Sequence, residues 1–244
     1  MSNTTAERDI SQAYYDADYF VKGNKQIIDP TSGQIKTWGY QGTDWSGHFH
    51  IVSGLNHIFN FEPTSMLDIG AGQGSFVDYA IRAGLLSKGY DFSEFAVANP
   101  IGFAKNNLFI GDAVAGIPEA DASYDVVYCS DMCEHIQKSK IDAVITEFFR
   151  ITRKWVFLQF PVMEPHETVF DWEVEVQKPE AERHVGWATF MLPLHLNMEH
   201  RSWWLAKFEA HGFKVREDLE PLFRAIVPQP VLTNWKNIVV LEKP

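Results

Sequence analysis

The stretch Met66-Leu67-Asp68-Ile69-Gly70-Ala71-Gly72-Gln73-Gly74-Ser75-Phe76 decides the fold of this chain. Its apolar first part fits a strand that is buried in a covered parallel sheet. The three glycines that follow allow unusual backbone angles and leave no side chain in the way of a ligand. From Phe76 onward the apolar residues recur with helical spacing, and Gly84 is a stop signal. The stretch therefore predicts a strand, a glycine-rich turn and a helix.

Asp68 decides between two uses of such a turn. A dinucleotide fold has the pattern G-x-G-x-x-G, with the helix N-terminus facing a pyrophosphate. Here the glycines follow G-x-G-x-G, and Asp68 lies two residues before the first of them. A carboxylate in that place would repel a phosphate and attract an ammonium group. A cofactor with an amino-acid end, a nucleoside end and no phosphate suits this site better. The alternative is an ordinary tight turn without a ligand.

Further strands follow, and an acidic residue ends the second one. Residues 85–91 are predicted to form that strand, with Asp91 about 20 residues after the glycine turn, where a carboxylate accepts hydrogen bonds from ribose hydroxyls. The alternative role for Asp91 is to cap the next helix, which Ser93 does better. Apolar patterns predict the remaining strands at residues 107–113, 124–131, 155–161, 213–217 and 237–241.

Two helices are predicted in the second half of the chain. Residues 139–151 have an amphipathic pattern. A second helix precedes Gly212, its expected stop, with Ser202 as its expected N-cap.

Residues 161–200 are too long for a normal connection and contain many histidine and acidic residues. We expect a substrate-binding insertion or lid there. A mixed cluster of this kind can suggest a metal, but its spacings match no motif such as H-E-x-x-H, so we expect no metal site.

The N-terminal residues 1–61 are expected to cap the domain formed by residues 62–244. An aromatic run around Tyr14 and Tyr19 is predicted either to dock on the core as a short helix or to form a flap over the cofactor. Residues 22–47 are rich in turn-forming residues and predict an extended loop or hairpin. A helix is expected over residues 50–61.

Taken in order, these features resemble the class I S-adenosylmethionine-dependent methyltransferases, whose first motif is an acidic residue, x, then G-x-G-x-G. The resemblance implies an α/β fold: a Rossmann-like, doubly wound, seven-stranded and mostly parallel sheet whose last strand is antiparallel. An N-terminal flap and an insertion after the fifth strand would be added to it. The implied reaction is attack by a substrate O, N or C atom on the sulfonium methyl group of S-adenosylmethionine.

The resemblance also implies roles for individual residues. Cofactor contacts are expected from Tyr14, Tyr19, Asp68, Gly70, Ala71, Gly72, Asp91, Phe92, Asp112, Ala113, Ser130 and Asp131. Asp112 would pair with the adenine amino group, although an Asx-turn is the alternative. His135 and His195 are the two candidates for a catalytic base. His135 could equally hold Glu134 or a loop in place.

Composition narrows the acceptor and the setting. A formal net charge of -11 disfavours a polyanion such as DNA or RNA as a partner. Two cysteines are too few for a disulfide framework or a four-ligand zinc site. No signal sequence or membrane span is evident, so we expect a cytoplasmic protein. Motifs of adenine-N6, cytosine-C5 and protein-arginine methylation are also missing.

These absences favour a small polar acceptor, such as a sugar or a nucleotide-linked sugar. Two rivals stay open. One is an NAD-dependent oxidoreductase, and the other is a module that binds S-adenosylmethionine without catalysis. The oligomeric state does not follow from the sequence.

Overall fold

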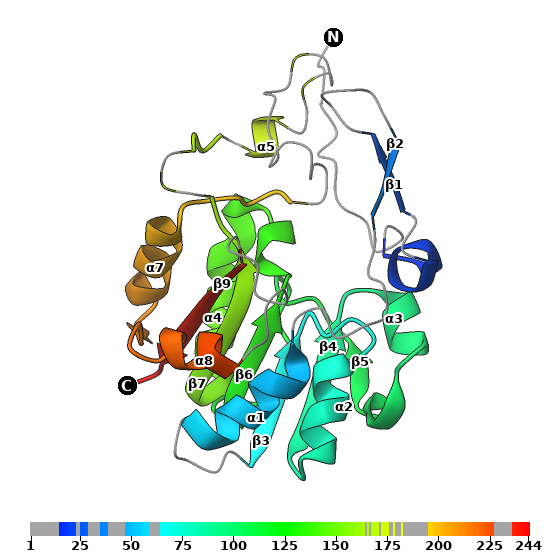
Figure 1. Ribbon diagram of the computed structural model, residues 1–244, viewed down its shortest axis with the longest axis vertical. Helices are drawn as coiled ribbons and strands as arrows, with labels where there is room; N and C mark the ends of the chain where they lie inside the picture. The colour runs from blue at the N-terminus through cyan, green and yellow to red at the C-terminus, as the bar shows by residue number, and fades with distance from the viewer. Residues whose placement is uncertain are drawn as a thin grey trace.

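A computed structural model describes residues 15–22, 25–28, 35–38, 47–58, 64–163, 165, 167–170, 172–175, 178, 182, 195–226 and 236–244. Within them, seven strands form a sheet in the order β5-β4-β3-β6-β7-β9-β8 (Figure 1). The strands are β3 (Ser65–Ile69), β4 (Leu86–Asp91), β5 (Leu108–Ile110), β6 (Tyr124–Ser130), β7 (Thr152–Pro161), β8 (Lys214–Val215) and β9 (Lys236–Glu242). β9 is antiparallel to both of its neighbours, whereas β3, β4, β5, β6 and β7 pair in parallel. The predicted sheet with its antiparallel last strand is confirmed.

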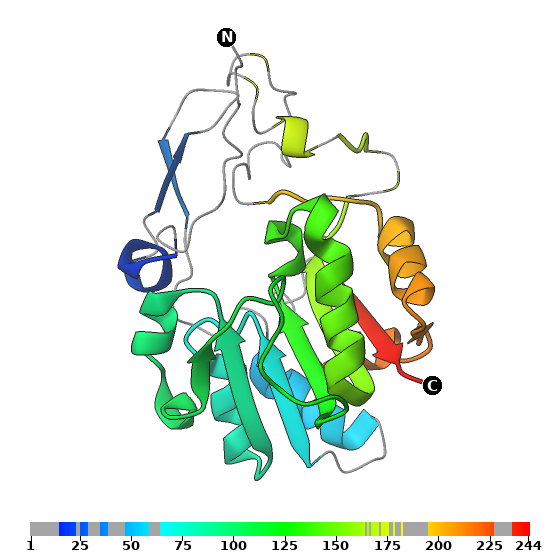
Figure 2. The same cartoon turned by 180° about the vertical axis from the view of Figure 1, so that it is seen from behind.

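Helices cover both faces of this sheet (Figures 1 and 2). On one face lie α1 (His48–Ile58), α2 (Ser75–Arg82) and α8 (Glu220–Ile226), and on the other lie α4 (Ile141–Ile151) and α7 (Arg201–Ala210). The strand β3 is buried on both faces: Met66 packs into the core beneath α1, α2 and α8, and Leu67 packs into the core beneath α4 and α7. The apolar run that predicted this strand is therefore explained by burial on two sides.

Shorter elements connect these layers. They are α3 (Glu94–Ala98), η3 (Gly102–Ala104), η4 (Cys133–His135), η5 (Lys138–Lys140) and α5 (Trp172–Glu175). None of the helices within the described ranges is long and apolar enough to span a bilayer.

The N-terminal segment forms a turn of π-helix, η2 (Asp18–Lys22), and an antiparallel hairpin of β1 (Lys25–Ile28) and β2 (Ile35–Trp38). Of the two structures predicted for residues 22–47, the described part is thus the hairpin. The helix α1 begins two residues before its predicted start. Tyr14 and half of residues 161–200 lie outside the described residues.

The predicted site residues that the structure describes lie at or after the carboxyl ends of the parallel strands, or beyond that edge of the sheet. The parallel strands end at the upper edge in Figure 1, and the N-terminal hairpin, α5 and the segment 195–200 lie beyond it. The segment 195–200 is tied to the end of β7, where Met163 bridges to His200.

Candidate functional site

The glycine turn after β3 needs its glycines. Gly70, Gly72 and Gly74 have φ angles of 83°, 54° and 86°, which L side chains rarely adopt. A Cβ atom on Gly70 would lie 2.8 Å from Cβ of Met132, and one on Gly74 would lie 2.5 Å from Cβ of Ala104. The turn is hydrogen-bonded to β4, where the Tyr90 carbonyl accepts the N–H groups of Gly70 and Ala71 at 2.9 and 3.0 Å.

Asp91, at the end of β4, already holds this turn. Its Oδ2 accepts the N–H of Gly72 at 2.7 Å, and its Oδ1 accepts the N–H of Ser93 at 2.7 Å. Burial raises the pKa of Asp91, and these two backbone N–H groups partly offset the rise. Each carboxylate oxygen has a second lone pair, so Asp91 can still accept from a ligand hydroxyl. Ser93 is the N-cap of α3, as predicted, and its Oγ accepts from the N–H of Ala96.

Asp68 makes the turn acidic. Its side chain is buried, and its pKa is raised well above the ordinary value, first by burial and then by the nearby charge of Asp91. A phosphate would bring a further negative charge to a pair of carboxylates that already oppose each other. A cationic group would relieve the opposition. The geometry thus fits a cationic, phosphate-free ligand and disfavours a pyrophosphate.

The turn after β5 contains Asp112 and Ala113. Asp112 Oδ1 accepts the N–H of Val114 at 2.8 Å, so the Asx-type turn weighed for this residue is present. Contact of Asp112 with an adenine stays a prediction, as do the contacts of Ala113 and Phe92.

The end of β6 borders the same edge. Ser130 Oγ donates to Oδ2 of Asp131 at 3.1 Å, and the Asp131 N–H donates to the carbonyl of Gln159 in β7 at 2.7 Å. Asp131 has a φ of 51°, a conformation that Asp adopts more readily than most residues. This turn sends the chain into η4, which carries Glu134 and His135.

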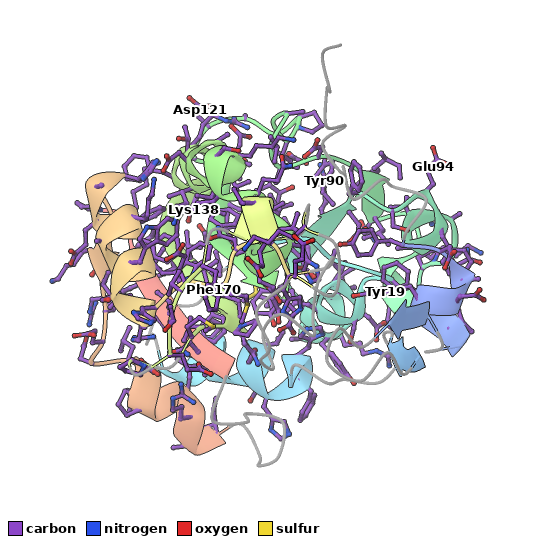
Figure 3. All side chains as sticks on the ribbon, turned by 90° about the horizontal axis from the view of Figure 1, so that it is seen from above. Tyr19, Tyr90, Glu94, Asp121, Lys138 and Phe170 are labelled. Atoms are coloured by element: carbon purple, nitrogen blue, oxygen red, sulfur yellow. The ribbon has the colours of Figure 1, made fainter. Side chains whose placement is uncertain are left out.

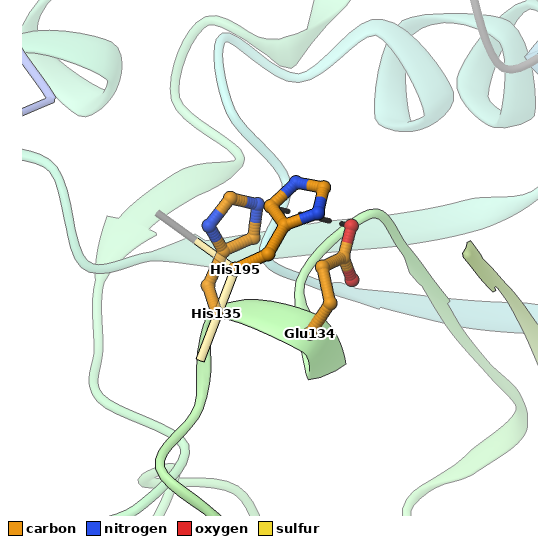
Figure 4. Close-up of side chains that lie close together, drawn as sticks. All are labelled: Glu134, His135 and His195. Carbon is orange, nitrogen blue, oxygen red and sulfur yellow. Dashed lines mark ion pairs between the residues drawn. The ribbon is translucent and has the colours of Figure 1, made fainter. Parts of the chain in front are cut away.

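The two predicted base candidates meet, although they lie far apart in the sequence. The ring centroids of His135 and His195 are 4.9 Å apart at an interplanar angle of 84° (Figure 4). The Glu134 carbonyl accepts the N–H groups of Leu196 and Asn197 at 2.7 and 3.0 Å, which fixes the segment that carries His195.

His195 is an uncharged imidazole. It is 5% exposed, and burial lowers its pKa well below the ordinary value. The neighbouring His135 lowers it further, while Asp131 acts in the opposite direction. Its Nδ1 is buried and has no hydrogen-bond partner among the described residues.

Two buried amides add polar atoms to the same edge. Gln159 lies beside Ser130 in the β6–β7 register, and Asn197 follows His195 by two positions. Both side chains are fully buried, and their amide N and O atoms have no hydrogen-bond partner within the described ranges. Buried polar groups in this state are costly unless a ligand or water pairs with them. Sequence reasoning missed both residues, because a single amide gives no pattern.

Tyr15 and Phe20 belong to the aromatic run that was predicted to dock on the core or to form a flap, but they were not among the expected cofactor contacts. Tyr15 Oη lies 3.3 Å from Nδ1 of His135, and its carbonyl accepts from Oγ of Ser93 at 2.5 Å. Phe20 approaches the turn so closely that a Cβ atom on Gly72 would lie 3.4 Å from its ring. Tyr19, whose ring meets that of Tyr15 edge to face, lies on the side of the molecule opposite Lys138 (Figure 3). The signal was present, because the pattern Tyr-x-x-x-Tyr-Phe begins at Tyr15 and not at Tyr14.

Comparisons with known proteins agree with this geometry. Residues 48–225 match a family described as a methyltransferase domain. No curated protein sequence gives a significant match. The solved structure of YcgJ from Bacillus subtilis superposes with a TM-score of 0.54 at 17% identity, covering 80% of this chain and 98% of that one.

Two further solved structures are similar in fold. Magnesium protoporphyrin IX methyltransferase from Synechocystis, solved with S-adenosylhomocysteine bound, gives a TM-score of 0.53 at 16% identity, covering 81% of this chain and 84% of that one. The mitomycin 7-O-methyltransferase MmcR gives 0.56 at 12% identity, covering 83% of this chain and 55% of that one.

Proposed function

Because this chain belongs to the methyltransferase-domain family, we propose that it methylates a small polar acceptor, such as a sugar or a nucleotide-linked sugar, with S-adenosylmethionine as its cofactor. One observation carries the proposal. An acidic glycine turn and the pair of His135 and His195 lie at the same edge of one sheet, and Tyr15 contacts His135 through its hydroxyl and Ser93 through its carbonyl.

The residues at the turn would hold the cofactor. Asp68 supplies negative charge for its ammonium group, and Asp91 accepts from its ribose hydroxyls. Asp112, Ala113 and Phe92 surround the adenine, while Ser130 and Asp131 border the methionine end. Residues 1–61, with Tyr14 and Tyr19, form a cap over the domain of residues 62–244. When bound, S-adenosylmethionine supplies a methyl group on a positively charged sulfur.

The other half of the site would hold the acceptor. Gln159 and Asn197 offer buried amide groups that pair with acceptor hydroxyls. A site built to hydrogen-bond a hydroxyl rejects analogues that lack it, so these amides favour a polyol such as a sugar over an apolar acceptor. The chain's main contribution is alignment, which lowers the barrier by several kcal/mol. The uncharged imidazole of His195, beside His135, offers a lone pair to the acceptor as its hydroxyl is activated.

Calorimetry and an acceptor panel test the proposal. The protein should bind S-adenosylmethionine and not NAD, and it should release S-adenosylhomocysteine when sugars or nucleotide-linked sugars are added. Gln159→Leu and Asn197→Leu should raise KM for the acceptor and leave cofactor affinity unchanged. Binding of NAD alone would instead support the oxidoreductase. Tight cofactor binding without product from any acceptor would support a non-catalytic module.

A further inference from the structure

Glu134, His135 and His195 form a cluster that the sequence pattern did not reveal. Each offers one ligand atom, and these three atoms lie within 4.8 Å of one another. Nε2 of His135 lies 3.8 Å from Oε1 of Glu134 (Figure 4). We infer that this cluster is a binding site for one divalent transition-metal ion of the zinc type.

The chemistry of the three groups fits such an ion. Two imidazoles and one carboxylate are a common ligand set of catalytic zinc sites, which keep a further position open for water or substrate. Imidazole ligands also favour zinc and its neighbours over magnesium or calcium, which prefer oxygen ligands only. Zinc holds its ligand atoms at about 2.0–2.2 Å, so the three atoms have to move together by about 1 Å on binding.

The surroundings orient the ligands for this role. Histidine ligands usually have their second ring nitrogen hydrogen-bonded to a neighbouring group. His135 meets this condition, because its Nδ1 pairs with the Tyr15 hydroxyl while its Nε2 faces Glu134. His195 is buried, and its Nδ1 has no hydrogen-bond partner in the described part of the chain.

Backbone hydrogen bonds hold the two histidines close together. Glu134 and His135 lie in η4 after β6, whereas His195 follows the insertion after β7. The hydrogen bonds from Leu196 and Asn197 to the Glu134 carbonyl hold these segments together. An ion here would therefore join the insertion to the carboxyl edge of the sheet.

Only the role of the ion rests on the proposed function. A nitrogen that binds the ion cannot accept a proton, so in the loaded protein the ion would bind the acceptor oxygen at its open position and lower the pKa of that hydroxyl, whose proton would pass to water. Binding of the ion itself needs no methyl transfer. Failure of the metal site and failure of the methyltransferase are thus separate results.

The test is a titration of the chelator-treated full-length protein with Zn²⁺, followed by calorimetry, and with Co²⁺, followed by its visible absorption. We expect one ion per chain, with the absorption of a nitrogen-ligated cobalt site. His195→Ala and Glu134→Gln should each weaken binding at least 100-fold. Tyr15→Phe, which removes only the hydroxyl beside His135, should weaken it about 10-fold. His211→Ala is the matched control, because His211 is the C-cap of α7, lies beside Asp142 and is not part of the cluster, and this variant should bind the ion as the wild type does.

Two results would overturn the inference: no stoichiometric binding by the wild-type chain, or binding that His195→Ala and Glu134→Gln leave unchanged. Circular dichroism of each variant confirms that it is folded before titration. If the chelated protein still releases S-adenosylhomocysteine at the full rate and binds no ion, the proposed function stands and the histidines act without metal.

Discussion

Asp68 lies in a place where burial and a second carboxylate, that of Asp91, both oppose a negative charge on its side chain. An ionised carboxylate in such a place lowers the stability of the ligand-free protein, and a bound cation offsets this loss. The sequence predicted this residue, and Asp91, because a carboxylate placed around a glycine turn is a local pattern. It did not predict that the Asp91 carboxylate also accepts the N–H of Gly72, because this contact between the end of β4 and the turn after β3 needs the folded sheet.

Asp68→Asn should weaken the binding of S-adenosylmethionine about 10- to 100-fold, because a hydrogen bond to a charged group contributes about 1.5–3 kcal/mol. The same change should raise the melting temperature of the ligand-free protein, since it removes a buried charge. Calorimetry and thermal unfolding measure the two effects. Asp125→Asn is the control: Asp125 accepts from Thr64 and Ser65 at the opposite end of β3, so its loss should lower stability and spare cofactor affinity.

The pH dependence of stability follows from the same raised pKa. A carboxyl group whose pKa is raised on folding binds its proton more tightly in the folded state than in the unfolded one. As the pH falls through the raised pKa of Asp68 toward its ordinary value of 3.8, the folded state therefore gains stability from this group. The difference in the free energy of unfolding between Asp68→Asn and the wild type should therefore become smaller over that pH interval. A stability difference that stays constant from pH 7 to about pH 4 would contradict the assignment.

At the scale of elements, the π-turn η2 packs against the glycine turn that we propose as part of the cofactor site. Phe20 lies against Gly72 and stacks on Phe95 of α3 at a centroid distance of 6.3 Å. The next residue, Val21, is 61% exposed. A segment with one buried anchor and an exposed neighbour is suited to opening and closing over a ligand.

Phe20→Ala should raise the dissociation rate of S-adenosylmethionine about tenfold or more, because it removes the contact that closes the segment on the turn. Val21→Ala, on the same element, should leave that rate unchanged. Stopped-flow displacement measures the rates, and hydrogen exchange over residues 15–22 should increase only in Phe20→Ala. Equal rates in both variants would show that the segment does not cover the cofactor.

Elements differ in how well the sequence predicts them. The strands were predictable because burial on both faces demands continuous apolar runs such as Val126 and Val127. The start of α7 was not: Ser202 was the expected N-cap, yet the cap position is His200, with no side-chain hydrogen bond. There the bridge between His200 and Met163 decides where the helix begins. The meeting of His135 and His195 was likewise beyond local patterns, because it depends on how the insertion folds back on η4.

At the scale of the whole molecule, Arg150 of α4 ties the helix to the loop before β6. It donates to the carbonyls of Glu119 and Ile117 at 2.6 and 2.8 Å, and to the Glu147 carboxylate at 2.8 Å. Arg150→Ala should lower the free energy of unfolding by about 2–4 kcal/mol, because hydrogen bonds to a charged group are lost and two carbonyls lose their donor. Denaturant unfolding measures this.

Arg82→Ala is the matched control for Arg150→Ala. Arg82 also pairs with a carboxylate, that of Asp78, but its side chain is 54% exposed. An exposed pair contributes about 0–1 kcal/mol. If the two variants lose similar amounts of unfolding free energy, the hydrogen bonds of Arg150 to the two carbonyls and to Glu147 do not stabilise the protein more than an exposed ion pair does.

The net charge of -11 predicts how salt acts on different acceptors. Raising the ionic strength from about 0.01 to about 0.1 M shortens the screening length from about 30 to about 10 Å. Repulsion of an anionic acceptor by the acidic molecule then weakens, so KM for a nucleotide-linked sugar should fall several-fold. KM for a neutral sugar should not change. Steady-state kinetics at the two salt concentrations measure this, and a rising KM for the anionic acceptor would indicate a local basic groove.

Tyr15 couples the two halves of the site, because its carbonyl meets Ser93 beside the glycine turn and its hydroxyl meets His135. If cofactor binding orders the segment that carries Tyr15, it also fixes the position of His135 in the acceptor half of the site. Catalysis should follow a compulsory order in which the nucleoside enters first and its demethylated product leaves last. That product, S-adenosylhomocysteine, would then compete with S-adenosylmethionine but not with the acceptor. Its accumulation would inhibit the reaction at any acceptor concentration.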